Sequence, residues 1–323
     1  MKAAVYYETG DPAVFRYEDV PDPECRPGGI VFAMEAVSIE GGDVLHRAGG
    51  ELATQPHTVG YQAAGTVREI GEGVTAFAVG DKVVATMPFG SHAELISVPA
   101  RAAFAIPAGG SFREAACAPI TFGTADDCLF EFGHLVEGET VLVQAGASGV
   151  GLAAIQLAKR ASATVIATAS NDGKLARLTG EFGLDHGINY VERDFVEAAR
   201  ELTEGRGPDL VVDAIGGKTL QGSLECVAYR GRVITVGGAG RDDTPLDRGP
   251  ILQKNASLIG VFLGGEMAAA HARTHTMMQR HVDDVAAGNL RMPVDCTFPL
   301  AAAAAAHAYI ESRQAFGRVV LTP

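Results

Sequence analysis

The sequence has few cysteines, and none of them belongs to a metal-binding or disulfide motif. The five cysteines are an odd number, are widely spaced and include no C-x-x-C; they are Cys25, Cys117, Cys128, Cys226 and Cys296. Zinc lobes and disulfide-rich secreted domains depend on closely spaced cysteines, so neither a zinc lobe nor a disulfide framework is indicated. We expect the chain to work in a reducing, cytoplasmic setting.

Positive charge is also in deficit, and long hydrophobic runs are missing. Lysine and arginine number 26 against 39 acidic residues, which gives a net charge of −13. This balance argues against nucleic acid or an anionic membrane surface as a partner. No apolar run approaches the ~20 residues of a transmembrane helix. The N-terminal MKAAVYYETG lacks the apolar core of a signal peptide.

The 323 residues suffice for two domains, and the sequence pattern changes near residue 122. Hydrophobic residues make up 47% and charged residues 20%, as in a globular protein. Before residue 122, strand-like runs recur between Pro and Gly residues, and helical patterns are few. These runs are Ala3–Tyr7, Ile30–Val37, Gly65–Ile70, Lys82–Ala85 and His92–Val98. The pattern predicts a compact, barrel-like β domain.

From Thr140 onward, strand patterns alternate with helix patterns. The expected strands after the first are Thr164–Ala169, His186–Asn189, Asp209–Ala214, Gly231–Val236 and Leu258–Phe262. This alternation predicts an α/β domain of the Rossmann type, a doubly wound parallel sheet with helices on both faces. Met267–Ala287 and Ala301–Ser312 are expected to be helices. The final GRVVLTP is expected to be a strand that returns to the N-terminal domain.

The central motif of the second region is Val141–Ala158, with the sequence VLVQAGASGVGLAAIQLA. A short β-branched run is followed by a small-residue turn and then by the apolar spacing of a helix. Glycines let such a turn approach a pyrophosphate, and the helix N-terminus offers it free N–H groups. The spacing is not a strict G-x-G-x-x-G, so a glycine-rich turn without a ligand is the alternative, but the strand and helix around it favour a cofactor. The residues expected to bind it are Gly146, Ala147, Ser148, Gly149, Val150 and Gly151.

Seven segments of the chain are, in order, MKAAVYYETGDPAVF, VGYQAAGTVREIGEGVTAFAVGDKVV, GASGVG, GINY, DLVVDAIGG, GRVITVGG and FGRVVLTP. In this order they resemble the medium-chain dehydrogenase/reductase superfamily, and specifically its zinc-free quinone oxidoreductase branch. The resemblance implies a GroES-like catalytic domain over residues 1–122, completed by residues 295–323, and a Rossmann NADPH-binding domain over residues 123–294. It also implies a homodimer that pairs Rossmann sheets edge to edge, with Asn255–Phe262 as the candidate edge.

The same resemblance allows a test for zinc. Zinc-dependent relatives place a Cys three residues before an Asp, and a Gly-His-Glu further on. Here Glu40 stands three residues before Asp43, and residues 60–62 are Gly-Tyr-Gln. A single carboxylate without His or Cys partners is a poor zinc site, so we expect no metal. His271 and His275 share a helix face at i and i+4, but a solvated helix with incidental histidines is the simpler interpretation.

The expected cofactor is NADPH. NAD-binding folds usually carry an acidic residue at the end of the second strand to hold the ribose hydroxyls, but here Ser170 and Asn171 follow that strand. The resemblance implies that Ser170, Lys174 and Tyr190 hold the 2′-phosphate instead. An ammonium and hydroxyls suit a dianion. A solvated lysine and a packing tyrosine are the alternatives, and Asp172 would oppose a phosphate.

Four more positions complete the expected cofactor site. The resemblance places Arg318 near the same phosphate, although a surface charge at the start of a strand is the alternative. Cofactor contacts are also expected at Asn171, Gly237 and Phe262.

The candidate catalytic residues are Tyr61, Glu40, Arg47 and Thr124. Without zinc, a carbonyl oxygen must be polarised by hydrogen bonds. Tyr61 stands where zinc-dependent relatives have a ligand histidine, so its phenol could donate to a developing oxyanion; a tyrosine that lines an apolar pocket is the alternative. Relatives hold the nicotinamide region with an Asn at the position of Glu40 and with a Thr that Thr124 matches. Arg47 matches an arginine of the cofactor cleft.

The resulting hypothesis is a zinc-independent, NADPH-dependent reductase of quinones or related conjugated carbonyls. A 2-enoyl reductase that acts on enones or enoyl thioesters is the alternative within enzymes, because one fold hosts both activities. A non-enzymatic NADPH-binding sensor is a third hypothesis, since Glu40 and Leu45 both depart from the pattern of the relatives.

Overall fold

The computed structural model describes all 323 residues, and they form two compact units. Unit 1 contains Met1–Ile120 and Glu266–Pro323, and unit 2 contains Thr121–Gly265. The second boundary thus precedes the expected one at residue 295, because α10 (His271–Ala286) packs on β7 (Ala103–Ala105) of unit 1. No helix combines the length and apolar character needed to cross a membrane.

Unit 1 is built on a seven-stranded sheet with the order β14-β15-β3-β4-β5-β7, and β6 also pairs with β3. Only β14 and β15 are parallel to each other. Besides β7, the strands of this sheet are β3 (Gly29–Ser38), β4 (Gln62–Ile70), β5 (Lys82–Thr86), β6 (Leu95–Pro99), β14 (Val294–Pro299) and β15 (Arg318–Thr322). The pairing of β15 with β3 confirms that the C-terminal strand returns to the N-terminal region.

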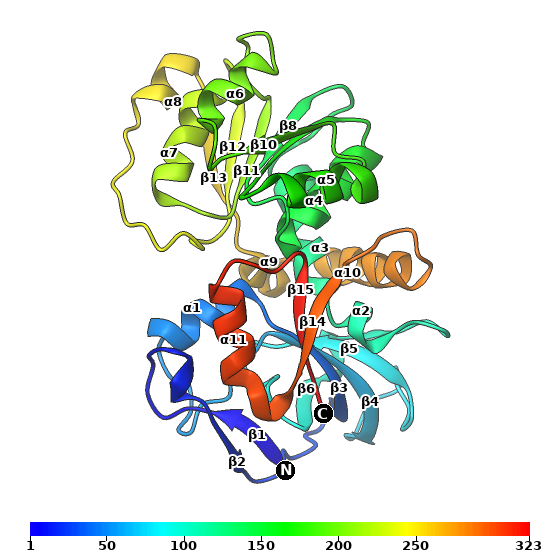
Figure 1. Cartoon of the computed structure of the whole chain (residues 1–323). Helices are drawn as coiled ribbons and strands as arrows, with labels where there is room; N and C mark the ends of the chain where they lie inside the picture. The colour runs from blue at the N-terminus through cyan, green and yellow to red at the C-terminus, as the bar shows by residue number, and fades with distance from the viewer. The chain divides into compact units, whose positions relative to one another are not determined.

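A small hairpin and several helices complete unit 1 (Figure 1). The hairpin is β1 (Lys2–Val5) with β2 (Arg16–Asp19). The helices are α1 (Gly41–Gly49), α2 (Phe112–Ala115), α10 and α11 (Ala303–Glu311). Two more helices, α3 (Pro119–Asp126) and α9 (Leu263–Ala269), cross the boundaries between the units. Short 3-10 turns cover Pro12–Val14, Ala100–Ala102 and Leu300–Ala302. The core lies where alternate apolar residues of the sheet, such as Phe32 and Val67, meet α11.

The single helix predicted over Met267–Ala287 is wrong in one respect, because the structure has two helices there. The backbone leaves helical geometry at Ala270 (φ −125°, ψ 44°), between α9 and α10. The turn sends α10 along β7. Nε2 of His275 donates to the Ala103 carbonyl of β7 at 3.2 Å, and Nε2 of His271 donates to the Arg101 carbonyl, in the turn before β7, at 3.1 Å. His275 therefore covers part of the open edge of a sheet, and His271 holds the turn that leads into it, roles that charge and periodicity do not reveal.

Unit 2 contains a six-stranded parallel sheet with the order β10-β9-β8-β11-β12-β13. The strands are β8 (Thr140–Val143), β9 (Thr164–Ala169), β10 (His186–Asn189), β11 (Leu210–Asp213), β12 (Arg232–Thr235) and β13 (Ser257–Gly260). In chain order this is the 3-2-1-4-5-6 arrangement of the Rossmann fold. The order reverses between β8 and β11, so the carboxyl ends of these strands mark the expected ligand edge.

Helices cover both faces of this sheet, α4 and α5 on one side and α6 and α7 on the other (Figure 1). They are α4 (Gly149–Arg160), α5 (Asp172–Phe182), α6 (Phe195–Glu201), α7 (Gly217–Cys226) and α8 (Gly249–Lys254), and α3 continues into a π-helix over Asp127–Glu131. Local sequence explains their ends: Asn171 caps α5, and Gly183, with φ 69°, ends it. The predicted alternation of strands and helices is confirmed.

Candidate functional site

The turn between β8 and α4 is shaped by residues that lack side chains. A Cβ atom at Gly151 would lie 2.4 Å from the carbonyl oxygen of Ala145, and one at Gly146 would lie 2.8 Å from the Cβ of Ala167. Both glycines therefore allow α4 to pack against the turn and the neighbouring strand. The Ser148 hydroxyl caps α4 by accepting from the Gly151 N–H at 3.1 Å. These close approaches fit the pyrophosphate of a dinucleotide at a helix N-terminus.

A buried chain of polar side chains lies beneath this turn. Thr168 donates to Oε1 of Gln144 at 2.8 Å, and its Oγ1 accepts from the backbone N–H of Ala145 at 3.0 Å. Nε2 of Gln144 donates to the Ser223 hydroxyl at 3.2 Å, which in turn donates to Asp213 at 2.8 Å. The chain spans the carboxyl ends of β9, β8 and β11, so it fixes the turn at the reversal point of the sheet.

Asp213 anchors the far end of this polar chain. Its Oδ1 accepts from the N–H groups of Ile215 and Gly216 at 2.8 and 2.9 Å, which shapes the loop before α7. Burial raises the pKa of this carboxyl. The sequence pattern alone does not single out Gln144, Thr168 or Asp213 as site residues. The available signal was a polar residue at the end of each of several buried strands.

The residues expected to hold the 2′-phosphate follow two neighbouring strands. Ser170 and Asn171 come directly after β9, and Tyr190 comes directly after β10 with its side chain 46% exposed. Asn171 caps α5 by accepting from the N–H of Lys174 at 2.9 Å. Because carboxyl ends of parallel strands share one edge of a sheet, the structure brings these residues together. Asp172, expected to oppose a phosphate, accepts from the Asn189 amide at 3.0 Å.

Gly237 follows the carboxyl end of β12, and Phe262 follows the carboxyl end of β13. The two strands are paired in parallel, so both residues lie at the carboxyl edge of the sheet. Gly237 has a φ of 88°, a conformation that favours glycine. Phe262 is 76% exposed, so its ring is available to a ligand or partner. All cofactor residues expected in unit 2 thus lie along the carboxyl edge of one sheet.

In unit 1, Glu40 is the centre of a buried polar cluster. Its side chain is 7% exposed, and its Oε1 accepts from Nε2 of Gln62 at 2.6 Å and from a guanidinium N–H of Arg318. The Ser38 hydroxyl lies 3.4 Å from the same oxygen. The backbone N–H of Glu40 donates to Asp43 at 2.7 Å at the start of α1. Burial raises the pKa of Asp43 well above its usual range.

Arg318 has partners in unit 1 that the sequence did not predict. Its Nε donates to the Ser38 hydroxyl at 2.9 Å, and its Nη2 also donates to the carbonyl of Ile39. The side chain is 8% exposed. The alternative of a surface charge at the start of a strand is therefore wrong. The expected contact with a phosphate stays a prediction, and its atoms already bind Glu40 and the end of β3.

Tyr61 lies against the start of α1. A Cβ atom at Gly42 would come within 2.5 Å of the Tyr61 ring and within 3.2 Å of its hydroxyl, so the glycine makes room for the ring. Burial, with the nearby Asp43 and Glu40 carboxyls, raises the pKa of Tyr61 to about 12. The phenol is consequently protonated at neutral pH and is able to donate a hydrogen bond.

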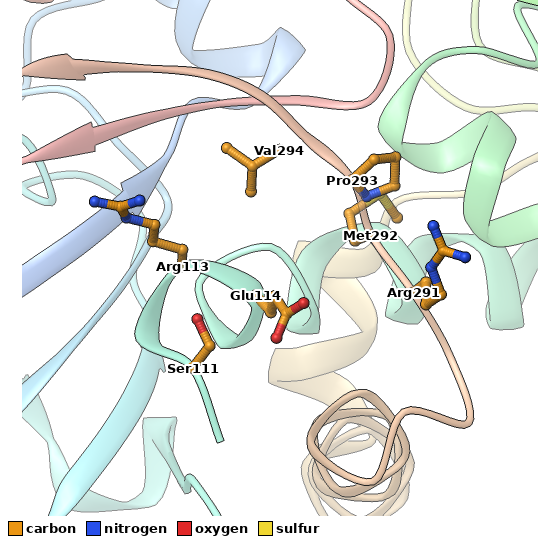
Figure 2. A pocket seen from close by; sticks show the side chains of 7 residues that line it. All are labelled: Ser111, Arg113, Glu114, Arg291, Met292, Pro293 and Val294. Carbon is orange, nitrogen blue, oxygen red and sulfur yellow. The ribbon is translucent and has the colours of Figure 1, made fainter. Parts of the chain in front are cut away.

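A cavity of about 340 Å³ also lies in unit 1, between α2 and the segment that leads into β14 (Figure 2). Its lining residues are Ser111, Arg113, Glu114, Arg291, Met292, Pro293 and Val294. Figure 2 shows the side chain of Glu114 between those of Arg113 and Arg291. The charged groups have both signs and do not converge on one point, so this cavity does not identify a ligand.

Two family models match most of the chain. The alcohol dehydrogenase GroES-like domain matches residues 26–122, and the zinc-binding dehydrogenase family matches residues 149–282. The 2-haloacrylate reductase of a Burkholderia species is 34% identical over 100% of this chain and 99% of its own length. The quinone oxidoreductase of Pseudomonas aeruginosa is 32% identical, with 97% of each chain covered. The Escherichia coli quinone oxidoreductase complexed with NADPH has a TM-score of 0.92 at 28% identity, with 100% of both chains covered.

The chain belongs to the medium-chain dehydrogenase/reductase superfamily, in its quinone oxidoreductase branch. The three relatives named above are reductases, which supports an oxidoreductase, and the structure has the superfamily's two parts, a GroES-like unit and a Rossmann unit. The α/β fold class expected from the sequence is confirmed.

One matching family of this superfamily is described as zinc-binding, but the residues here do not fit such a site. No group of three or more His, Cys, Asp or Glu side chains is arranged to hold a metal ion. Glu40, at the first ligand position, is paired with the guanidinium of Arg318. His271 and His275 donate to backbone carbonyls. The guanidinium of Arg318 is thus the positive charge that pairs with Glu40 in this structure.

The last two candidate catalytic residues of this superfamily member have different surroundings. Thr124 lies on α3 in unit 2 and is 7% exposed. Arg47, on α1, is 1% exposed and donates to Glu311 of α11 at 2.5 Å and to the carbonyl of Gly10. These bonds tie α1 to α11 and to the N-terminal loop. Arg47 thus has a structural function in unit 1, and its expected contact with a cofactor stays a prediction.

Proposed function

We propose that the protein is a zinc-independent, NADPH-dependent reductase of quinones or related conjugated carbonyls. The observation that carries the proposal is the carboxyl edge of the Rossmann sheet. At this edge a glycine turn precedes the capped helix α4, and a serine, a lysine and a tyrosine follow the neighbouring strands. No acidic residue ends β9, and the nearby carboxylate of Asp172 is bonded to Asn189. Ser170, Lys174 and Tyr190 would hold the 2′-phosphate, and the turn would hold the pyrophosphate.

The chain's own residues would orient and polarise the acceptor. NADPH supplies a hydride when bound, and the protein supplies position and hydrogen bonds. Tyr61 is protonated at neutral pH, so its hydroxyl would donate to the oxygen on which negative charge develops. The Glu40 cluster would fix the start of α1, against which the Tyr61 ring lies.

A 2-enoyl reductase is the second candidate function. The 34% identical relative is called a 2-haloacrylate reductase, and a haloacrylate is an alkene conjugated to a carboxylate. Quinones, enones and haloacrylates share a polarised double bond that accepts hydride. The same hydrogen-bond donor would therefore serve either acceptor.

The deciding experiment is cofactor oxidation against a small panel of acceptors. NADPH and NADH are compared with a para-quinone, a simple enone, an enoyl thioester and 2-chloroacrylate, each with and without a chelator. Fast, chelator-insensitive oxidation of NADPH by the quinone supports the proposal. Preference for the enone, thioester or chloroacrylate moves the function to the second candidate. Cofactor binding without turnover on any acceptor indicates a non-enzymatic sensor, and activity lost to the chelator contradicts zinc independence.

We also propose a homodimer formed through unit 2, in a reducing, cytoplasmic compartment. β13 is one of the two edge strands of the sheet, and Leu252, Phe262 and Tyr229, in the segments around it, are 78%, 76% and 65% exposed. An open parallel edge with exposed apolar side chains favours pairing with a second copy. All five cysteines are free, as suits a reducing compartment. Light scattering that gives a mass of one chain contradicts the dimer.

A further inference from the structure

Arg318 is buried between two segments that are far apart in the sequence. Its backbone N–H donates to the carbonyl of Pro293 at 2.9 Å, which fixes the start of β15. Its side chain then extends to the end of β3, where its partners are consecutive residues: the Ser38 hydroxyl, the Ile39 carbonyl and the Glu40 carboxylate. One guanidinium thus holds the segment that leads into α1.

The carboxylate of Glu40 is fixed from a second direction as well. Nε2 of Gln62 donates to the same Oε1 that Arg318 binds, at 2.6 Å. Oε1 of Gln62 accepts from the backbone N–H of Ile120 at 3.1 Å, so the orientation of this amide is determined. Because a buried charge is costly without its partner, Glu40 and Arg318 depend on each other.

The contacts of Arg318 and the expected phosphate cluster belong to different units. Ser170, Lys174 and Tyr190 lie at the carboxyl ends of β9 and β10 in unit 2. Arg318 uses both Nε and Nη2 for bonds within unit 1. A guanidinium held in this way is a fixed element of its own cluster.

We propose that Arg318 is a positioning residue that acts through Glu40 and does not distinguish NADPH from NADH. It holds the carboxylate in place beside α1 and Tyr61, and Lys174 provides the discrimination between the two cofactors. This inference rests on the proposed function as an NADPH-dependent reductase.

The first test compares cofactor discrimination in Arg318→Gln and Lys174→Ala. In Arg318→Gln, we expect the ratio of the two KM values, NADH over NADPH, to stay within about twofold of wild type. In Lys174→Ala the ratio should fall about tenfold, the usual effect of removing one charge-assisted hydrogen bond. Arg68→Gln, which removes an exposed arginine on β4 of the same unit, is the matched charge control. A fall of the ratio in Arg318→Gln similar to that in Lys174→Ala overturns the proposal.

The second test is a double-mutant cycle of Arg318→Gln with Glu40→Gln. Breaking the buried pair in Arg318→Gln should lower the melting temperature by about 10 °C, and the double variant should recover part of this loss, because neither charge is then unpaired. The kcat of folded, saturated enzyme should fall about tenfold in either single variant, and the double variant should match Glu40→Gln. Arg318→Lys keeps the charge but cannot span all three partners, so its kcat should be intermediate.

The outcomes separate this proposal from the proposed function. Additive effects on kcat, or a normal kcat in folded Arg318→Gln, show that Arg318 does not act through Glu40. If wild-type protein binds NADPH but reduces no acceptor, the reductase function fails, and the ratio of dissociation constants for NADPH and NADH decides the question of discrimination. If wild type binds neither cofactor, both proposals fail, while the melting temperatures still measure the coupling of the pair.

Discussion

The two units build their candidate sites in opposite ways. In unit 2 the turn before α4 depends on side chains that are absent, because Gly146 and Gly151 leave room for close backbone packing. In unit 1 the cluster around Glu40 depends on side chains that are present and charged. A site made of backbone tolerates variation in charge but not in volume, and a site made of buried charges tolerates neither the loss nor the exposure of a partner.

The largest expected effect is that of a side chain placed in the turn of unit 2. Gly151→Val sets a branched side chain against the Ala145 carbonyl, where a Cβ atom alone would be 2.4 Å away. We expect NADPH affinity to fall more than about 100-fold, or about 3 kcal/mol, because α4 must move away from the turn. Fluorescence titration with NADPH measures this. An affinity within threefold of wild type would show that the turn does not bind the cofactor.

The next effect tests a polar group of unit 1. Tyr61→Phe removes the hydroxyl and keeps the ring against Gly42. Turnover should fall about 100-fold, the usual contribution of a positioned proton donor, while NADPH affinity stays within twofold. Stopped-flow measurement of NADPH oxidation separates the two quantities. Tyr7→Phe, an exposed tyrosine of the same unit, is the control, and equal turnover in both variants contradicts the role of Tyr61.

Acid should destabilise unit 1 through its buried histidines. Burial lowers the pKa of His57 to about 4 and of His92 to about 3, and His92 faces His307 across 3.2 Å. Since the unfolded chain binds these protons near pH 6.5 and the folded chain does not, stability is full above that pH and falls as the pH drops towards 4. At pH 5.5, His57 and His92 should each lower the free energy of unfolding by about 1.4 kcal/mol relative to its value at high pH.

Urea unfolding at pH 7.5, 6.5 and 5.5 measures this dependence. His92→Gln should flatten it, whereas His134→Asn, at an exposed position of unit 2, should leave it unchanged. Hydrogen exchange should show unit 1 opening first at pH 5.5. Equal acid sensitivity of wild type and His92→Gln contradicts the assignment.

The smallest expected effect comes from a glycine of unit 2 that lies outside the turn. Gly180 lies in the interior of α5 in unit 2, is exposed, and has nothing within 4 Å of the place of a Cβ atom. Gly180→Ala should therefore stabilise the protein by about 0.5–1 kcal/mol, as expected from helix propensity. Thermal unfolding measures it. A destabilised variant would show that unit 2 is intolerant of any added volume, and not only of volume in the turn.

The difference between the two candidate sites also explains which of their features the sequence could predict. The turn of unit 2 is local, since a strand, three glycines and a helix follow one another within Val141–Ala158, so its place was found directly. The buried polar chain from Thr168 to Asp213 was missed, because its members come from three strands and a helix. A polar residue at a strand end does not indicate which other strand end it contacts.

Unit 1 shows the same limit more strongly. Glu40 and Arg318 were identified separately as site residues, but not as partners, because 278 positions separate them in the sequence. His271 and His275 have the spacing of a metal pair, yet they donate to the backbone carbonyls of Arg101 and Ala103, in an edge strand and the turn before it, about 170 residues earlier. The break at Ala270 was also missed, since helix propensity does not include the path needed to reach β7.

The pairing of β15 with β3 affects how the protein folds while it is being synthesised on the ribosome. Arg318 is synthesised 278 residues after Glu40, a delay of between about 15 and 55 s at ~5–20 residues per second. During this interval all of the Rossmann unit emerges and is free to fold, while the GroES-like unit still lacks β14, β15 and α11. The nascent chain therefore carries an unpaired Glu40 and an open sheet edge for the whole time in which the Rossmann unit is made, and this is the stage at which the edge is exposed to aggregation.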